Sequence, residues 1–274
     1  MVIKSTKSQF GAAELFINQK LTLCGQSRCM ARFHGHYYED GALCLVHQME
    51  GTLTLANALQ KSDFPWNVEE ALTGRPRQPE LRNGLGEPSL ARRSMLIRRI
   101  TSQLFHDLAG IHEWNVVHRD VKGANLILSE KERRFKLIDF GAACDLVSKT
   151  NYDPKLQVFD PCYAPPEAPP DEGGLVLSAG GRFDVFSAGL LLVQMCFPAC
   201  KGNDGIKRFQ RALRLNDYSL SKWRRSVEHI PAYATGFRIL DRHGGFSLLE
   251  GCLQQRPHSR ISSAAAARSR FCFV

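Results

Sequence analysis

The sequence has 274 residues, with 36 Lys and Arg against 27 Asp and Glu, so its formal net charge is +9 at pH 7. Hydrophobic residues make up 43% and charged residues 23%, which excludes a disordered or collagen-like chain and allows a sizeable core. The length suits one large domain or two small lobes. The longest nearly apolar stretch, residues 185–199, is shorter than the roughly twenty residues that span a bilayer, so we expect a buried helix there. Residues 1–10 lack the apolar core of a secretory signal.

The nine cysteines are odd in number and lie mostly in apolar segments, which is typical of reduced, buried thiols in an intracellular protein. Cys24 lies near Cys29 and Cys196 near Cys200, but neither pair has the CxxC spacing of a zinc or redox site. The positive charge favours acidic partners such as anionic lipid surfaces, nucleic acid or acidic protein patches, and charge alone selects none of them. The densest basic stretch, residues 201–225, lacks the interleaved aromatic residues of a single-strand binder. We therefore expect a solvated helix face there and no nucleic-acid partner.

The first 48 residues predict a strand, a helix and a second strand. Residues 2–3 are typical of the end of a strand, and residues 42–48 form a short apolar run that predicts a buried strand leading into a connector. Within residues 11–23, apolar side chains recur at helical spacing, and Glu14 falls on their inward face. A buried carboxylate needs a partner.

The rest of the chain predicts helices separated by loops. Residues 61–88 are rich in Pro, Gly, Arg and Glu and have little periodicity, which predicts an irregular surface insertion. Apolar residues from 97 to 111 step by three or four and predict a long amphipathic helix, followed by a strand at residues 116–117. Residues 168–181 predict a loop, and residues 183–197 predict a central helix that is apolar on nearly all sides.

The strongest motif is the run His-Arg-Asp-Val-Lys-Gly-Ala-Asn at residues 118–125, followed by Asp139-Phe140-Gly141 behind a strand-like run at 135–138. Phosphoryl transfer needs a carboxylate to accept a hydroxyl proton, a cation near the transferred group, and oxygen ligands for magnesium. In this order and spacing, the residues resemble the protein kinase superfamily. The resemblance implies an α+β fold with two lobes, a small β-rich N-lobe and a large, mainly helical C-lobe.

The resemblance also implies a role for each polar residue of the motif. Asp120 would be the catalytic base, Lys122 would contact the γ-phosphate of ATP, and Asn125 and Asp139 would hold Mg²⁺. A lysine at position 122 is similar to serine/threonine kinases rather than tyrosine kinases.

Neighbouring residues of the motif correspond to supporting positions in the family. His118 and Phe140 correspond to packing positions, and Arg119 corresponds to a residue that contacts a phosphate on the activation segment. The candidates for that phosphate are Ser148, Thr150 and Tyr152.

The nucleotide site would be completed by residues nearer the N-terminus. Residues 1–4 resemble the VAIK strand, whose lysine, here Lys4, holds the α- and β-phosphates and pairs with a helix glutamate, here Glu14. His47 falls at the gatekeeper position. The hinge, whose backbone groups would bind adenine, corresponds to Gln48, Met49 and Glu50.

Three residues correspond to structural positions of the family. Residues 163–167 resemble the APE end of the activation segment with Pro165 in place of alanine, and Arg260 matches the arginine that pairs with its glutamate, Glu167. Asp184 opens a run similar to DxWSxG and would brace the catalytic loop by accepting backbone hydrogen bonds.

Stretches outside these motifs narrow the resemblance. FGAAELFINQKL, FKLIDFGAACDL and RFDVFSAGLLLVQM are similar to the thylakoid state-transition kinases of plants and algae, and the similarity runs from Lys4 to about Phe271. It implies a chloroplast serine/threonine kinase at the stromal face of the thylakoid membrane, with ATP and magnesium as cofactors. Its protein substrates would be light-harvesting antenna or other thylakoid proteins, and a basic surface suits work beside an anionic membrane.

The sequence departs from the family pattern at its start, because the two strands and the GxGxxG loop that would precede Lys4 are not in it. By the same alignment, residues 1–47 correspond to a truncated N-lobe, 48–51 to the hinge, and 52–274 to the C-lobe with an insertion at about 61–90. Two functions stay open: an active kinase whose N-terminal part is cut short in this sequence, or an inactive pseudokinase-like binding module or fragment without the ATP glycine loop. The complete set of Asp120, Lys122, Asn125 and Asp139 favours the kinase, and Lys122 disfavours a small-molecule phosphotransferase.

Overall fold

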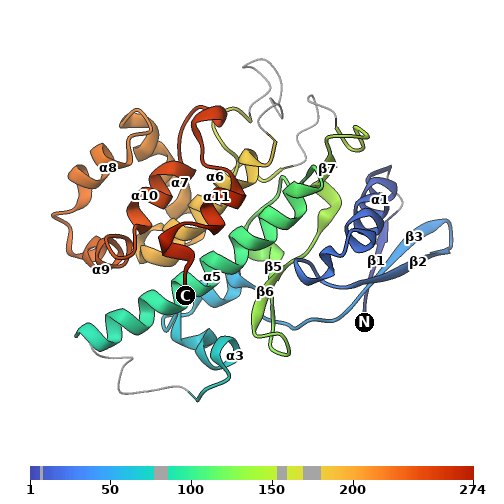
Figure 1. Cartoon of the computed structure of the whole chain (residues 1–274), viewed down its shortest axis with the longest axis horizontal. Helices are drawn as coiled ribbons and strands as arrows, with labels where there is room; N and C mark the ends of the chain where they lie inside the picture. The colour runs from blue at the N-terminus through green and yellow to red at the C-terminus, as the bar shows by residue number, and fades with distance from the viewer. Residues whose placement is uncertain (7–8, 77–85, 153–158, 169–179) are drawn as a thin grey trace.

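The computed structural model describes residues 1–6, 9–76, 86–152, 159–168 and 180–274. The chain forms a small lobe, in which one helix covers a three-stranded sheet, and a larger lobe built mainly of helices (Figure 1). This confirms the two-lobed α+β fold that the sequence predicts.

The small lobe contains the two strands and the helix predicted for the first 48 residues, which are β1 (Val2–Thr6), α1 (Gln9–Leu23) and β3 (Ala42–His47). It also contains β2 (Phe33–Glu39), a strand for which the sequence analysis gave no residues. The sheet is antiparallel with the order β1-β3-β2, and Lys4 lies opposite Leu45. Asp40 and Gly41 join β2 to β3 with φ angles of 49° and 72°, as a tight hairpin turn requires. On α1, Ile17 and Leu21 are fully buried, so the apolar stripe of this helix packs into the core.

The connector between the lobes leaves β3 without regular structure and leads to α2 (Leu55–Gln60). A Cβ at Gly51 would lie 2.2 Å from the carbonyl oxygen of Leu128, so the absence of a side chain lets the connector approach the large lobe closely. Thr54 caps the start of this helix, because its hydroxyl accepts a hydrogen bond from the Asn57 amide at 3.2 Å.

Residues 61–88 were expected to form an irregular surface insertion, but their first half contains short helical pieces and contributes to the core. Residues 66–68 form a turn of 3₁₀ helix and α3 spans Glu69–Thr73. The buried apolar side chains of this part are Phe64, Trp66, Val68 and Leu72. Because the chain turns through short, irregular helical pieces, its core residues show no period of 3.6. Residues 77–85 lie outside the described residues.

The large lobe is organised around two long helices, α5 (Glu87–Glu113) and α6 (Arg182–Cys196). The helix predicted from residue 97 begins ten residues earlier, with Pro88 in its first turn, where proline is well tolerated. Every residue of α6 from 183 to 196 is buried, which confirms the predicted central helix. The remaining helices surround these two (Figure 1): α7 (Gly202–Leu215), α8 (Leu220–Val227), α9 (Pro231–Leu240), α10 (Gly245–Cys252) and α11 (Ser263–Ala267).

Four short strands lie in the large lobe where it faces the small one. They form two antiparallel pairs: β4 (Val116–Val117) with β7 (Cys144–Asp145), and β5 (Leu126–Ser129) with β6 (Arg134–Leu137). The strands predicted at residues 116–117 and 135–138 are thereby confirmed. The loop predicted at residues 168–181 lies almost entirely outside the described residues.

The basic stretch at 201–225 covers α7 and α8. On α7, Ile206, Phe209 and Leu213 are buried, whereas the cations Lys207, Arg208, Arg211 and Arg214 are exposed. The expected solvated helix face is confirmed. Among the described helices, none has the length and apolar character needed to cross a bilayer.

A buried ion pair fastens the segment after residue 159 to the end of the chain. The Arg260 guanidinium donates two hydrogen bonds of 2.5 Å to the Glu167 carboxylate, and its side chain is fully buried. Its remaining hydrogen bonds go to backbone carbonyls of Arg182, Gln254 and Gln255. The pairing predicted for these two residues is confirmed.

Glu167→Ala should lower the free energy of unfolding by about 3 kcal/mol, because it leaves a buried guanidinium without its counter-charge. Asp241→Ala provides the matched control, since Asp241 also binds an arginine through two bonds, to Arg224 at 2.5 and 2.9 Å, but on the exposed surface. Asp241→Ala should lower the free energy of unfolding by no more than about 1 kcal/mol. Urea unfolding of both variants measures the difference, and equal losses would contradict the assigned role of burial.

Candidate active site

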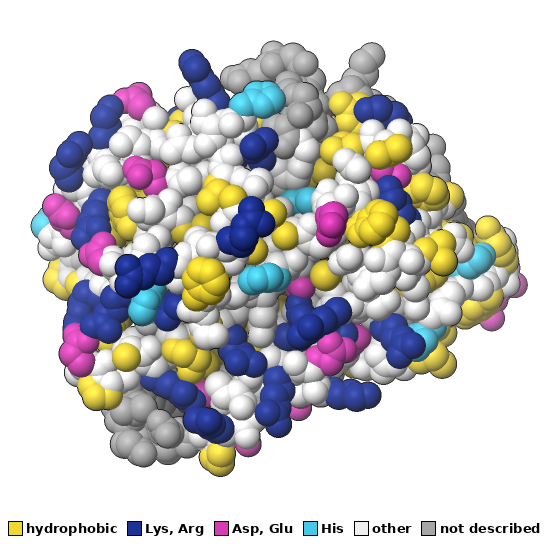
Figure 2. Space-filling view, in the orientation of Figure 1, with side chains coloured by type: hydrophobic (Ala, Val, Ile, Leu, Met, Phe, Trp, Pro, Cys, Tyr) yellow, Lys and Arg dark blue, Asp and Glu magenta, His cyan; other side chains and the backbone are white. Residues whose placement is uncertain are grey.

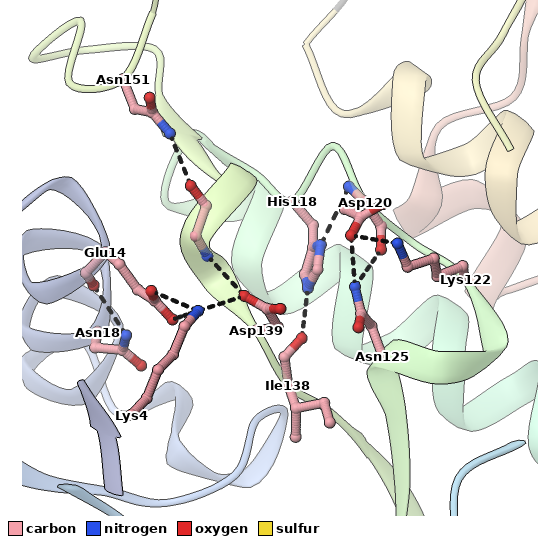
Figure 3. A network of polar contacts seen from close by, with 11 residues as sticks. Lys4, Glu14, Asn18, His118, Asp120, Lys122, Asn125, Ile138, Asp139 and Asn151 are labelled. Atoms are coloured by element: carbon pink, nitrogen blue, oxygen red, sulfur yellow. Dashed lines mark hydrogen bonds and ion pairs between the residues drawn. The ribbon is translucent and has the colours of Figure 1, made fainter. Parts of the chain in front are cut away.

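The first part of the site is an ionic cluster that joins β1, α1 and the segment after β6 (Figure 3). The Lys4 ammonium lies 2.8 Å from the Glu14 carboxylate and 2.7 Å from Oδ1 of Asp139. Glu14 is buried on the inward face of α1, as its spacing predicts, and Lys4 is the partner that its burial requires. The predicted Lys4–Glu14 ion pair is confirmed.

The cluster shifts the pKa of each of its members. Burial favours neutral Lys4, but the hydrogen bonds and charges of Asp139 and Glu14 outweigh it and raise the pKa of Lys4. For Glu14, burial raises the pKa, and the attraction of Lys4 offsets this rise only in part, so the pKa stays above its ordinary value. For Asp139, the attraction of Lys4 outweighs burial and lowers the pKa. The site therefore holds a firmly charged ammonium beside an ionised Asp139.

The second part of the site is the loop between β4 and β5. Lys122 lies 3.0 Å from Oδ2 of Asp120, and the Asn125 amide donates to the backbone oxygen of Asp120 at 2.9 Å and to its Oδ2 at 2.8 Å. These contacts fix the Asp120 carboxylate from two sides (Figure 3). The sequence motif thus brings its three polar residues into one hydrogen-bonded group.

Asp160 joins this group, and the sequence analysis missed it. Its amide donates to Oδ1 of Asp120 at 3.3 Å, and its carboxylate lies 3.4 Å from the Lys122 ammonium. Burial lowers the pKa of Lys122, but the bonds and charges of Asp120 and Asp160 outweigh it and raise that pKa. The signal that could have found Asp160 is its place close before residues 163–167, the run that resembles the end of the activation segment.

Asp184, at the start of α6, holds the backbone of the loop. Its two carboxylate oxygens accept hydrogen bonds from the amides of His118 and Arg119, both at 2.8 Å, which confirms the predicted brace. A third bond, missed from the sequence, comes from Nε2 of His112 at 2.8 Å, and Nδ1 of His112 lies 2.7 Å from the Ser263 hydroxyl. Burial alone would raise the pKa of Asp184, but these partners outweigh it and lower the pKa.

Arg119 binds the segment that follows Asp139. Its buried guanidinium donates to the carbonyl oxygens of Ala142 at 2.6 Å and Asn151 at 2.8 Å. The Asn151 side chain in turn donates to the Gly141 and Ala143 carbonyls at 3.2 and 2.8 Å. Of the phosphate candidates, Ser148 hydrogen-bonds Asp145 and Thr150. In this structure Arg119 therefore organises the segment through backbone carbonyls.

His118 and Phe140 pack against each other between the two parts of the site. Their ring centroids are 4.8 Å apart, and Nε2 of His118 lies 3.2 Å from the Ile138 carbonyl oxygen. Both residues are buried, in keeping with the packing positions that they were expected to hold.

A cavity of about 380 Å³ opens beside the ionic cluster, between the small lobe and the connector. It is lined by Val2, Ile3, Lys4, Glu14, Asn18, Ala31, His47, Gln48, Met49, Glu50, Gly51, Ile127, Leu137, Ile138, Asp139 and Phe140. The structure thus brings the predicted hinge residues together with Lys4, Glu14 and Asp139. Asp120, Lys122 and Asn125 are not among the lining residues and lie in the neighbouring loop. An apolar cavity with a few convergent charges is typical of a small-molecule site.

Comparison with known proteins places this geometry in a family. The profile described as "Protein kinase domain" matches residues 12–272. The chain belongs to the protein kinase family. This confirms the resemblance on which the roles of the kinase motifs rest.

Two similar curated proteins come from Arabidopsis thaliana. Serine/threonine-protein kinase STN7, chloroplastic, is 34% identical over 94% of this chain and 49% of its own length. Serine/threonine-protein kinase STN8, chloroplastic, is 33% identical over 95% of this chain and 56% of its own length. The kinase domain described here spans about half the length of these relatives.

A solved structure has the same fold. The crystal structure of a Stt7 homolog from Micromonas algae, soaked with ATP, superposes with a TM-score of 0.78 at 26% sequence identity. The match covers 97% of this chain and 81% of that one. The α+β arrangement of the kinase domain is therefore shared over nearly its whole length.

The residues present fit a magnesium ion that also binds phosphate oxygens. Because both bonds from the Asn125 amide nitrogen go to Asp120, its carbonyl oxygen is the atom left to face a cation. Asp139 receives Lys4 and the Gly141 amide on Oδ1, which leaves Oδ2 available. Mg²⁺ typically takes one or two protein oxygens and completes its shell with phosphates and water. Among the described residues no cluster of three His, Cys, Asp or Glu side chains could hold a metal alone.

Asp184→Asn should cost about 3 kcal/mol of unfolding free energy at pH 7, because the new amide group faces a backbone N–H instead of accepting from it. The lowered pKa gives this loss a pH dependence. Asp184 contributes its stability above the unfolded pKa of about 3.9, and the contribution disappears as the pH falls through the lower folded pKa. The difference in unfolding free energy between wild type and Asp184→Asn should therefore become smaller below about pH 4.

Urea unfolding at pH 7 and pH 3 checks this expectation. Asp204→Asn, on the exposed first turn of α7, is the matched control and should leave the unfolding free energy unchanged at both pH values. A gap that stays constant between the two pH values would contradict the assigned role of the Asp184 charge.

Proposed function

We propose that this chain is an ATP-dependent serine/threonine protein kinase. The observation that carries the proposal is the joint geometry of the two groups, Lys4 with Glu14 and Asp139, and Lys122 with Asp120 and Asn125. A binding module would not require both groups to be complete. The relatives' names support the serine/threonine class, as does the lysine at position 122.

The proposed chemistry assigns a task to each residue. ATP, when bound, supplies the γ-phosphoryl group, and magnesium neutralises charge on its phosphates. Lys4, held by Glu14, would bind the α- and β-phosphates, and the backbone of Gln48, Met49 and Glu50 would bind adenine. Asp120 would take the proton of the substrate hydroxyl as that oxygen bonds to the γ-phosphorus, while the bond from this phosphorus to the oxygen of the β-phosphate breaks and ADP leaves. Lys122 would bind the transferred phosphoryl group while Asp120 and Asp160 keep it protonated.

The proposed substrates are thylakoid proteins, with light-harvesting antenna proteins first among them. Two considerations support this choice: the similarity of FGAAELFINQKL and RFDVFSAGLLLVQM to state-transition kinases, and the chloroplastic relatives. The net charge of +9 suits work beside an anionic membrane. We place the enzyme at the stromal face of the thylakoid membrane.

Asp120→Asn should reduce phosphate transfer by about 10² to 10⁴-fold, because the amide cannot accept the hydroxyl proton. The measurement is transfer of labelled phosphate from Mg-ATP to kinase-depleted thylakoid membranes, followed by phosphoamino-acid analysis of the labelled proteins. Labelled serine or threonine on antenna proteins is the expected product. Asp204→Asn is the matched control, since it makes the same chemical change on an exposed helix far from the loop in sequence.

Each other outcome rejects part of the proposal. Equal transfer by wild type and Asp120→Asn would remove Asp120 as the base. Transfer to proteins other than the antenna would keep the kinase and change the substrate. Absence of transfer by the wild-type chain, while fluorescent ATP still binds, would favour a binding module.

Glu14→Gln should weaken binding of a fluorescent ATP analogue by about 10 to 100-fold. A hydrogen bond to a charged group contributes roughly 1.5 to 3 kcal/mol, and without it Asp139 alone would position the Lys4 ammonium. Glu113→Gln, on the exposed end of α5, is the control and should bind like wild type. Unchanged affinity of Glu14→Gln would mean that the ion pair does not prepare Lys4 for phosphate.

A further inference from the structure

A second cavity of about 380 Å³ borders the connector and shares Gln48, Met49 and Glu50 with the nucleotide cavity. We refer to it as the outer groove. Its charged lining residues are Arg28, Arg32, Glu50, Lys131, Glu132 and Lys136. Because the connector forms a wall of both cavities, an occupant of the outer groove would touch the segment proposed to bind adenine.

A buried ion cluster forms part of this groove. The Lys136 side chain is only 2% exposed, and its ammonium lies 3.0 Å from Glu50 and 2.5 Å from Glu132. Glu50 also accepts hydrogen bonds from the Ser129 hydroxyl at 3.0 Å and from the Arg32 amide at 3.2 Å. The contacts bind the connector to the hairpin β5–β6, so the groove has a fixed polar wall.

The remaining cations of the groove lack close counter-charges. In the part of the chain that the structure describes, the Arg32 and Lys131 side chains form no ion pair or hydrogen bond, and both residues are exposed. Arg28 interacts at longer range with the buried Asp107. Four cations line the groove against two carboxylates, which leaves an excess of positive charge. Figure 2 shows Lys and Arg side chains gathered over this region, near the hairpin β5–β6.

Glu132 indicates that the groove can bind a carboxylate. It lies in the turn of the hairpin, its side chain is 39% exposed, and its carboxylate reaches the buried Lys136 ammonium. The chain thus places one carboxylate of its own in the groove, beside cations that stay unpaired. A carboxylate from another chain could pair with Arg32 and Lys131, or replace Glu132 at Lys136.

We propose that the outer groove binds an acidic, extended peptide segment of a partner protein. The charge excess supplies complementarity, and the volume accommodates a few side chains. Carboxylates on such a segment would pair with the exposed Arg32 and Lys131, and one of them could reach the buried Lys136, where an ion pair is stronger than on an open surface. The proposal concerns binding and does not rest on phosphate transfer.

The test uses a fluorescein-labelled decapeptide that contains six Asp or Glu residues, and a neutral version with Asn and Gln in their place. Fluorescence anisotropy measures binding to the full chain at 50 and 150 mM salt. The acidic peptide should bind, with lower affinity at the higher salt, and the neutral one should not. Arg32→Glu with Lys131→Glu should raise Kd at least tenfold.

A matched double variant separates the groove from general surface charge. Arg225→Glu with Arg268→Glu reverses two exposed cations elsewhere, one on α8 and one directly after α11, and should change Kd less than twofold. Glu132→Gln removes one of the two carboxylates paired with Lys136 and should tighten binding several-fold, whereas Glu113→Gln, the same change on α5, should not. Circular dichroism checks that each variant is folded, and Arg32→Gln with Lys131→Gln repeats the test if charge reversal disturbs folding.

Several results would overturn the proposal. These are absence of binding to the wild-type chain, equal binding of the neutral peptide, or equal losses in the two double variants. Phosphatidylglycerol vesicles provide a further arm. If the vesicles bind through Arg32 and Lys131 and the peptide does not, the groove recognises lipid headgroups instead.

Discussion

The geometry of the active site depends on the hydrogen bonds that the buried Asp184 carboxylate accepts from the backbone of the loop between β4 and β5. Asp184 lies at the first turn of α6, a helix surrounded by the core of the large lobe, so its position is set by packing. Its oxygens fix the amides of His118 and Arg119, and Asp120 follows directly in the chain. Any movement of this carboxylate would move the proposed catalytic base.

Such anchoring matters because the site contains backbone that is unfavourable in isolation. Arg119 and Asp139 have φ angles of 64° and 62°, in the left-handed region that residues other than glycine rarely adopt. Each such residue costs on the order of 1 kcal/mol or more, and surrounding contacts must hold it. The Asp184 carboxylate holds Arg119 by accepting a hydrogen bond from the Arg119 amide. The Asp139 carboxylate is held by the Lys4 ammonium and the Gly141 amide, which both donate to it. Contacts from both lobes therefore stabilise the backbone of the site, from Lys4 in the small lobe and from Asp184 in the large lobe.

The extent to which the sequence predicts this structure depends on how local the determining pattern is. The HRD and DFG motifs have fixed spacing, so Asp120, Lys122, Asn125 and Asp139 could be found, and helical spacing placed Glu14 inward. Asp160 and His112 were missed because their roles arise only when segments far apart in the chain meet: Asp160 is 38 residues from Lys122, and His112 is 72 residues from Asp184.

The error at residues 61–76 has a different physical cause. The segment is rich in charged and turn-forming residues, yet Trp66 and Leu72 enter the core through short helical pieces that have no repeating period. Even the polar residues belong to the interior: Glu69 is buried and accepts a bond from Arg92 of α5 at 2.6 Å. A pairing of this kind cannot be read from composition, which favours the surface for both side chains.

In the connector, the backbone and the side chain of Glu50 face different parts of the molecule. The proposed function assigns the backbone around Glu50 to adenine, and the residue lines the cavity beside Lys4. Its carboxylate, however, is held by Lys136, Ser129 and the Arg32 amide in the wall of the outer groove. Because the hydrogen bonds of Lys136 lower the pKa of Glu50 against the effect of burial, this carboxylate stays ionised. The Glu50 side chain thus fixes the connector to the large lobe, while its backbone stays beside the cavity that contains Lys4.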